Sequence, residues 1–214
     1  MPVARLNRRL AAVPVKTETE IRRIIWVALI VIALLALIAA FFLDQTIATW
    51  ISAHSSPKLK RAMEIVSRMG DWPAHFIAGL IGIAVAFAAK SKKWIRIFLA
   101  MLIALALAGV TGRAIKFATG RARPSVRTEE HWNGPRFSSK YHAFPSGHVA
   151  ASTAFFATFF LARKKIGGPL LLIPILIGVS RMVVGAHYLS DVTFAATLGV
   201  ICAFLAAHWL SIRN

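Results

Sequence analysis

The chain has 214 residues, of which 57% are hydrophobic, and a formal net charge of +18. Soluble domains average about 45–50% apolar residues, so this composition excludes an ordinary soluble domain and favours a membrane protein. The Lys and Arg residues fall in clusters between apolar runs, as membrane topology and anionic lipid surfaces require, so nucleic acid is excluded as the main partner.

Six apolar runs follow a basic tail, residues 1–23, which is expected to face the cytoplasm. The first run has the roughly 20 apolar residues that a spanning helix needs, and it is too long for a signal-peptide core. The predicted spans are 24–43, 74–89, 94–111, 148–162, 170–184 and 188–209. The predicted fold class is all-α: an integral membrane bundle of six transmembrane helices formed by 24–214, with a polar active-site loop between helices 3 and 4.

Residues 57–69, between the first two spans, are predicted to form an amphipathic helix. Leu59, Met63, Val66 and Met69 recur at helical spacing opposite a basic face. Such a helix either lies along the membrane interface, where it would gate substrate, or acts as an ordinary connector. Both roles stay open at this point.

Loop charges predict the orientation. Short loops at 90–96 and 163–165 are dense in Lys and Arg and lie on the same side as the tail. The positive-inside rule therefore places the tail inside and the long polar segment, about 112–147, outside.

That polar segment begins with a basic stretch containing Lys116 and Arg123. Gly120 is expected to end the third helix, and Pro124 biases Arg123 toward an extended backbone, so both cations can turn toward a common point. Lys supplies a point charge, and Arg a planar fork that matches phosphate oxygens. Taken alone, basic residues at an interface more often bind lipid headgroups.

A second stretch, Ser146-Gly147-His148, stands directly before the fourth span. Ser146 is expected to cap the helix, and Gly147 to let another group approach the backbone closely. The free N–H groups of a helix start form an anion site, and His148 can pass a proton to a bound anion. The alternative is a capped helix start with an interfacial histidine.

The last polar stretch holds Arg181, His187 and Asp191 among apolar residues. A charge within a span costs about 2.5–3.5 kcal/mol on insertion scales, which makes such residues functional candidates. A helix beginning near Gly185 would put His187 and Asp191 on one face, so that the carboxylate accepts one imidazole proton and leaves the other nitrogen free to react. A buried structural His–Asp pair is the alternative.

All three stretches fall on one predicted side of the membrane and together suit a phosphate. Their order and spacing resemble the type 2 phosphatidic acid phosphatase family, whose pattern is K-x6-RP, then PSGH, then SR-x5-H-x3-D. Every fixed position is present: Lys116, Arg123, Pro124, Pro145, Ser146, Gly147, His148, Ser180, Arg181, His187 and Asp191. The six-span layout extends the resemblance to nearly the whole chain outside the tail.

The resemblance implies a metal-independent phosphatase without cofactors. His187 would attack phosphorus and form a phosphohistidine, Asp191 would fix the tautomer of His187, and His148 would act as acid and then base. The substrate phosphate would be held by Lys116, Arg123, Arg181, Ser146 and the amide of Gly147.

The implied substrate is a phosphorylated membrane lipid, with undecaprenyl pyrophosphate, phosphatidic acid, phosphatidylglycerophosphate and lipid A as candidates. The implied location is a bacterial inner membrane, with the site facing the periplasm or exterior. One alternative transfers the phosphoryl group to another lipid or sugar; another, of a different class, is a transporter or non-catalytic lipid-binding protein. Oligomeric state is not readable from the sequence.

Several polar residues that are not assigned to the site receive structural interpretations. Arg121 and Arg127 are expected to be solvated charges, and Ser180 to hydrogen-bond Arg181. The insert at 128–137 joins two parts of the predicted site, so its position suggests a role in substrate selectivity.

Overall fold

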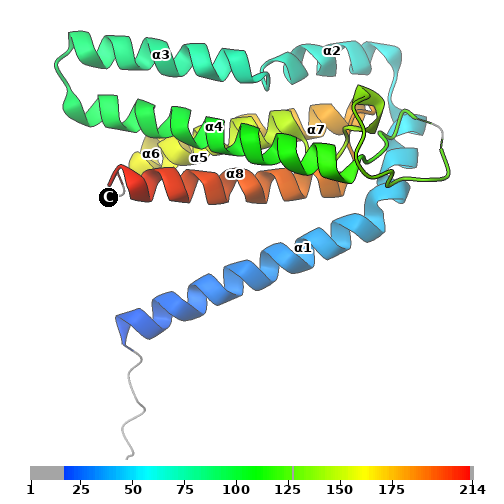
Figure 1. Ribbon diagram of the computed structural model, residues 1–214, viewed down its shortest axis with the longest axis horizontal. Helices are drawn as coiled ribbons and strands as arrows, with labels where there is room; N and C mark the ends of the chain where they lie inside the picture. Colours follow the sequence, from blue (N-terminus) through cyan, green and yellow to red (C-terminus); the bar gives the residue numbers. More distant parts are fainter. Residues whose placement is uncertain (1–16, 127, 213–214) are drawn as a thin grey trace, which may run out of the picture. The chain divides into compact units, whose positions relative to one another are not determined.

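The computed structural model describes residues 17–126 and 128–212, and all the named elements within them are helical (Figure 1). The predicted all-α class is confirmed. The elements are α1 (Glu18–His54), α2 (Pro57–Arg68), α3 (Trp72–Ala88), α4 (Lys92–Thr119), a 3-10 turn η2 (Ser139–Tyr141), α5 (Gly147–Ala162), α6 (Lys164–Leu170), α7 (Leu172–Val183) and α8 (Leu189–Trp209). Of the predicted tail, residues 1–16 lie outside the described part, and 18–23 belong to α1.

Five helical stretches in the described part are long and apolar enough to cross a membrane. They are Glu18–His54, Pro57–Ala88, Lys92–Thr119, Lys164–Val183 and Leu189–Trp209. The shorter apolar helix α5 has 16 residues. Integral membrane character is therefore confirmed, whereas the predicted count of six spans is not.

The chain divides into two compact units, residues 1–36 and 37–214. In the first unit, the described residues form the start of α1, which begins where Thr17 and Glu20 exchange hydrogen bonds between side chain and backbone. This reciprocal arrangement satisfies N–H groups that the first turn leaves free. The apolar side chains that follow it are exposed, as lipid-facing residues of a spanning helix are.

In the second unit, α5 packs against α4, α7 and α8 (Figure 1). Small side chains make this close packing possible: a Cβ added at Gly199 of α8 would lie 2.7 Å from the Cβ of Thr153 on α5. The buried cluster consists mainly of alanines with Val149, Ile177, Leu198 and Cys202. Because neighbours surround it, α5 is the most buried helix of the bundle although it is short.

The third predicted span, 94–111, lies within α4, which continues to Thr119. The prediction that Gly120 ends this helix is confirmed. Gly120 adopts φ +52, and a Cβ there would lie 1.7 Å from the carbonyl oxygen of Gly134, so only glycine fits. The fifth predicted span, 170–184, is divided between α6 and α7 after Pro169, which cannot donate a helical hydrogen bond.

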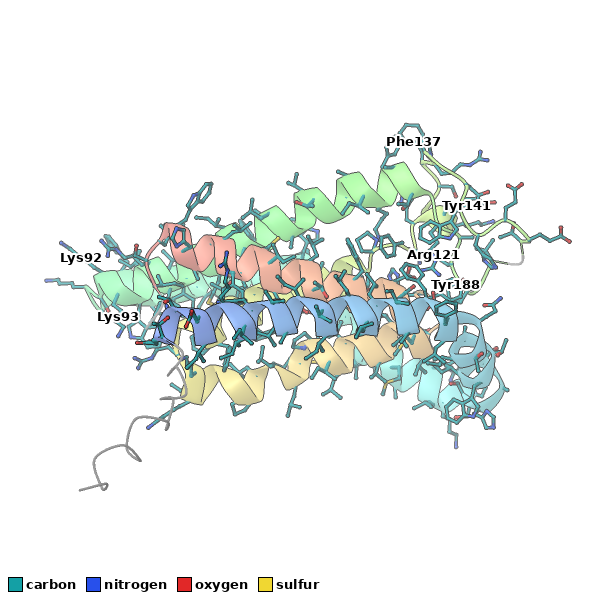
Figure 2. The ribbon with its side chains drawn as sticks, turned by 90° about the horizontal axis from the view of Figure 1, so that it is seen from below. Lys92, Lys93, Arg121, Phe137, Tyr141 and Tyr188 are labelled. Atoms are coloured by element: carbon teal, nitrogen blue, oxygen red, sulfur yellow. The ribbon has the colours of Figure 1, made fainter. Side chains whose placement is uncertain are left out.

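The polar loop lies at one end of this unit. Arg121, Tyr141 and Tyr188 gather at that end, and Lys92 and Lys93 lie at the opposite end (Figure 2). At this end, the polar loop connects α4 to α5 and a short turn connects α7 to α8, so the N-termini of α5 and α8 meet there. Their free N–H groups favour an anion.

Candidate active site

The structure brings the three predicted stretches together at the loop end. The Ser146 amide donates to the Asp191 carbonyl at 3.2 Å and so connects the second stretch to the third. Lys116 Nζ of the first stretch donates to the His142 carbonyl at 2.8 Å, and His187 Nδ1 of the third contacts the Ala143 carbonyl at 2.6 Å, both in the loop just before the second stretch. The convergence expected from the motifs is thus present in the fold.

His187 lies in the turn between α7 and α8, and not on a helix beginning near Gly185 as predicted, because α8 begins at Leu189. A carbonyl oxygen only accepts hydrogen bonds, so the contact with Ala143 assigns the proton to Nδ1 and leaves the lone pair on Nε2. Asp191, the predicted acceptor of this proton, does not accept it. Its Oδ2 lies 3.6 Å from Nδ1, which is close enough for electrostatic attraction but beyond hydrogen-bond distance.

The pKa of His187 is lowered to about 4, mainly by burial; Asp191 opposes the lowering in part, and the charges of Lys116 and Arg181 contribute to it. The ring is therefore neutral at pH 7. A neutral imidazole with its lone pair on Nε2 is the form in which histidine acts as a nucleophile.

Asp191 is fully buried in the first turn of α8. Its Oδ2 accepts the Tyr188 amide at 2.7 Å, and its Oδ1 accepts Arg121 Nη1 at 2.6 Å. Both oxygens are thus held, which fixes the carboxylate close to His187.

Several buried donors of the predicted site residues have no protein partner among the described residues. Among the described residues, four buried side-chain polar atoms have no hydrogen-bond partner: Arg121 Nε, Arg123 Nε, Ser146 Oγ and Arg181 Nε. Three of them belong to residues predicted to hold phosphate. Ser146 occupies the predicted N-cap position of α5, yet its hydroxyl makes no capping hydrogen bond. Buried polar groups are normally paired, so these three donors indicate a site for an acceptor.

The neighbourhood of these donors is also open and basic. A Cβ built on Gly147 would meet no described atom within 4 Å, which leaves space in front of the start of α5. Arg181 Nη1 donates to Ser67 Oγ of α2 at 2.6 Å, which fixes the guanidinium in place. Burial lowers the pKa of Arg123 below its ordinary value and the charge of Asp191 raises it in part, and an arginine in proteins stays charged.

His148, in the first turn of α5, has an acidic partner that the sequence analysis missed. Its Nε2 lies 2.7 Å from Oδ1 of Asp71, the residue before α3. The position of Asp71 next to Trp72-Pro73 marks a helix start, but no local pattern links it to a histidine 77 residues later.

A cavity of about 400 Å³ adjoins these residues. Pro124, Met182 and Tyr188 line it, and each is the chain neighbour of a predicted site residue. The remaining lining mixes apolar residues with polar ones, the polar ones being Gln45, Thr49, Ser52, Lys60, Ser125, Thr128 and His131. A second hollow, of about 470 Å³, is lined by Ala162–Ile166. Among the described residues, no predicted site residue itself lines either hollow. The residues described form no group of three or more His, Cys, Asp or Glu with the arrangement of a metal site.

Residues 95–214, more than half of the chain and all three motifs, match the profile of the PAP2 superfamily. The chain belongs to the PAP2 superfamily. It is 30% identical over 199 residues to a lipid A 1-phosphatase of Rhizobium johnstonii, an alignment that covers 85% of this chain and 80% of that protein. It is 32% identical over 105 residues to the undecaprenyl-diphosphatase BcrC of Bacillus subtilis, covering 46% of this chain and 53% of that one.

The fold of this PAP2 protein also resembles a solved structure. The crystal structure of a transmembrane PAP2-type phosphatidylglycerolphosphate phosphatase from Bacillus subtilis aligns with a TM-score of 0.66 at 22% identity, over 86% of this chain and 94% of that one. The comparisons confirm the class predicted from the sequence, a membrane lipid phosphatase.

Two interpretations of residues outside the PAP2 catalytic set are wrong. Ser180 Oγ donates to the Ile177 carbonyl at 2.7 Å and does not bond Arg181, because the hydroxyl of a helical serine readily reaches a carbonyl of the preceding turn. Arg121, predicted to be solvated, is only 5% exposed and forms two ion pairs. Arg127, predicted to be solvated as well, lies outside the described residues.

Proposed function

We propose that this PAP2 protein removes phosphate from a membrane lipid through a phosphohistidine on His187. One observation carries the proposal: Arg123 Nε, Ser146 Oγ and Arg181 Nε, from three separate segments of the motifs, are buried without acceptors. A phosphate offers three equatorial oxygens, which accept such hydrogen bonds strongly because they are charged.

In the first step, His187 Nε2 attacks phosphorus, the bond between phosphorus and the lipid oxygen breaks, and His148 gives that oxygen a proton. The imidazole gains positive charge as the P–N bond forms. The Ala143 carbonyl and the nearby Asp191 carboxylate stabilise this charge. Asp71 holds the His148 ring in position through its 2.7 Å contact.

In the second step, His148 takes a proton from water while the water oxygen attacks phosphorus. The P–N bond breaks, inorganic phosphate leaves, and His187 regains its lone pair. Lys116, Arg123, Arg181, Ser146 and the Gly147 amide hold the oxygens in both steps.

For the substrate, we propose lipid A carrying a 1-phosphate, with undecaprenyl diphosphate as the second candidate. The name of the relative that aligns over most of both chains supports the first. The cavity supports it too, because the hydroxyl and amide side chains among its described lining residues suit a sugar headgroup. We place the enzyme in a bacterial inner membrane with the site facing the periplasm, on the basis of the loop charges.

The test uses the purified full chain in detergent, incubated with each candidate lipid in the presence of EDTA. Phosphate release is expected with EDTA present, and His187→Ala should abolish it. Rapid quenching with radiolabelled substrate should trap an acid-labile, alkali-stable phosphoprotein in the parent and none in His187→Ala. Release that continues in His187→Ala would refute the phosphohistidine mechanism.

Two alternatives give different outcomes in the same assay. A lipid phosphoryl transferase would release little phosphate from a single lipid and would label an added acceptor lipid or sugar instead. A transporter or non-catalytic lipid-binding protein would bind the lipid without releasing phosphate in any arm.

A further inference from the structure

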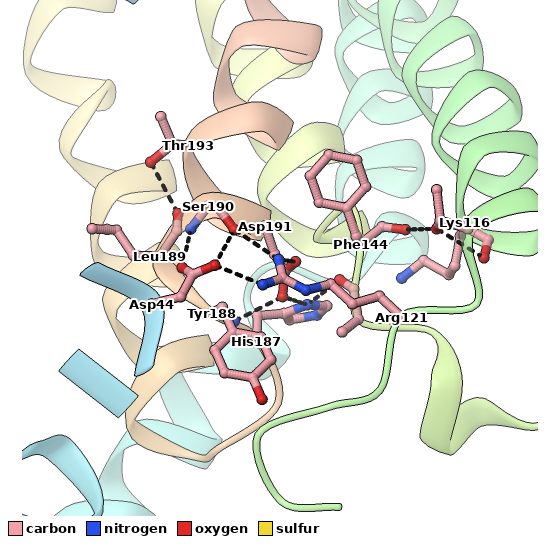
Figure 3. A network of polar contacts seen from close by, with 12 residues as sticks. Asp44, Lys116, Arg121, Phe144, His187, Tyr188, Leu189, Ser190, Asp191 and Thr193 are labelled. Atoms are coloured by element: carbon pink, nitrogen blue, oxygen red, sulfur yellow. Dashed lines mark hydrogen bonds and ion pairs between the residues drawn. The ribbon is translucent and has the colours of Figure 1, made fainter. Parts of the chain in front are cut away.

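Arg121, which is not a fixed position of the three motifs, lies at the centre of a buried polar network (Figure 3). Its Nη1 contacts Asp191 Oδ1 at 2.6 Å and Ser190 Oγ at 2.7 Å, and its Nη2 contacts Asp44 Oδ2 at 2.6 Å. The rings of Phe41, Trp132 and Tyr188 lie within cation–π distance of its guanidinium. A guanidinium held on every side in this way has essentially one position.

Arg121 fixes both groups that face Nδ1 of His187. Its side chain holds Asp191 Oδ1, which orients the carboxylate whose Oδ2 lies 3.6 Å from Nδ1. Its backbone carbonyl accepts the Ala143 amide at 3.0 Å, and the carbonyl of Ala143 in turn accepts the Nδ1 proton. One residue thus positions the nucleophile through two separate routes.

Asp44, in the second half of α1, completes the charge balance. Its Oδ1 accepts the Ser190 amide at 2.8 Å, and its Oδ2 accepts Ser190 Oγ at 2.5 Å and Arg121 Nη2. The charges of the Asp44 and Asp191 carboxylates and the Arg121 guanidinium add up to −1. This balances the single positive charge that the imidazole gains when it is phosphorylated. Without Asp44, Arg121 would neutralise Asp191 at the moment when its negative charge is needed.

We propose that Arg121, supported by Asp44, is a positioning residue for phosphoryl transfer to His187. Neither side chain contacts the donors that would hold phosphate, so the pair acts on the nucleophile and its charge rather than on substrate binding. This inference rests on the proposed phosphohistidine mechanism.

The test compares Asp44→Asn and Arg121→Lys with the parent enzyme in detergent. Both variants should lower kcat by about 10- to 100-fold, as expected when a nucleophile is misplaced by a fraction of an ångström, and change KM by less than threefold. In rapid-quench experiments, the rate of phosphohistidine formation should fall by the same factor as kcat. Arg163→Gln is the matched control, because Arg163 stacks on Trp94, outside the site, and its loss should leave kcat unchanged.

The outcomes separate this inference from the proposed function. A parent enzyme that releases no phosphate, or a His187→Ala variant that still does, contradicts the mechanism itself. An active parent with folded Asp44→Asn and Arg121→Lys variants of unchanged kcat overturns only the positioning role. If one variant fails to fold, the other decides; if both fail, the pair serves the fold and the inference is overturned.

Discussion

Replacing Ser146 by alanine should lower the rate of catalysis without lowering the stability of the fold. Ser146 is fully buried, its hydroxyl has no protein partner, and it does not cap α5. Alanine therefore removes no hydrogen bond from the unliganded protein. It removes an unpaired buried hydroxyl, whose burial costs about 1–3 kcal/mol, so the variant should be at least as stable as the parent.

Catalytic activity, in contrast, should fall. In the transition state, the hydroxyl would donate to a charged phosphate oxygen, a hydrogen bond worth about 1.5–3 kcal/mol. At about 1.4 kcal/mol for each power of ten, its loss should lower kcat by about 10- to 150-fold. The assays are phosphate release from the lipid substrate in detergent and thermal unfolding of the same preparation.

Ser152→Ala is the matched control on the same helix. Ser152 is equally buried, but its hydroxyl is satisfied by the His148 carbonyl at 2.7 Å, so alanine should leave kcat close to that of the parent. The reasoning fails if Ser146→Ala unfolds at a lower temperature and keeps full activity, because the hydroxyl would then serve the fold.

Three further predictions follow from the site. His187 has a pKa of about 4 when folded and about 6.5 when unfolded, so between these pH values the unfolded chain binds a proton that the folded protein does not. The free energy of unfolding should therefore fall by up to about 3 kcal/mol as the pH drops from 7 to 4. Thermal unfolding in detergent, measured at stepped pH, should show a shallower fall for His187→Gln than for the parent. Asp71→Asn should lower kcat more than it raises KM, measured by steady-state phosphate release, because His148 loses a charged partner but the phosphate ligands remain. Arg181→Lys should lower kcat/KM by about 10- to 100-fold in the same assay despite the retained charge, because lysine cannot donate to both Ser67 and a phosphate oxygen from a fixed fork.

Each of these three predictions would be contradicted by one specific result. An equal pH dependence of unfolding in the parent and His187→Gln would mean that another group titrates. An unchanged kcat in Asp71→Asn would remove Asp71 from the positioning of His148. Full activity of Arg181→Lys would show that only the charge at this position matters.

The sequence by itself determined the membrane class, the helical fold class and the three phosphate-binding stretches. These features are local: apolar run length decides whether a segment can span, and motif spacing appears in the printed chain. The end of α4 at Gly120 could also be predicted, because a glycine that ends a helix is a local signal. The family pattern then allowed the separate stretches to be assigned to one site.

Only the tertiary structure decided which groups hold the reacting residues. The acceptor for Nδ1 of His187 is a backbone carbonyl 44 positions away, and the partners of Arg121 lie 70 and 77 positions from it. A lone Arg121 or Asp44 looks like a solvated charge in the sequence, since burial of either is favourable only when the other is beside it. Such pairs arise when helices pack, and the spacing of residues along the chain carries no record of that packing.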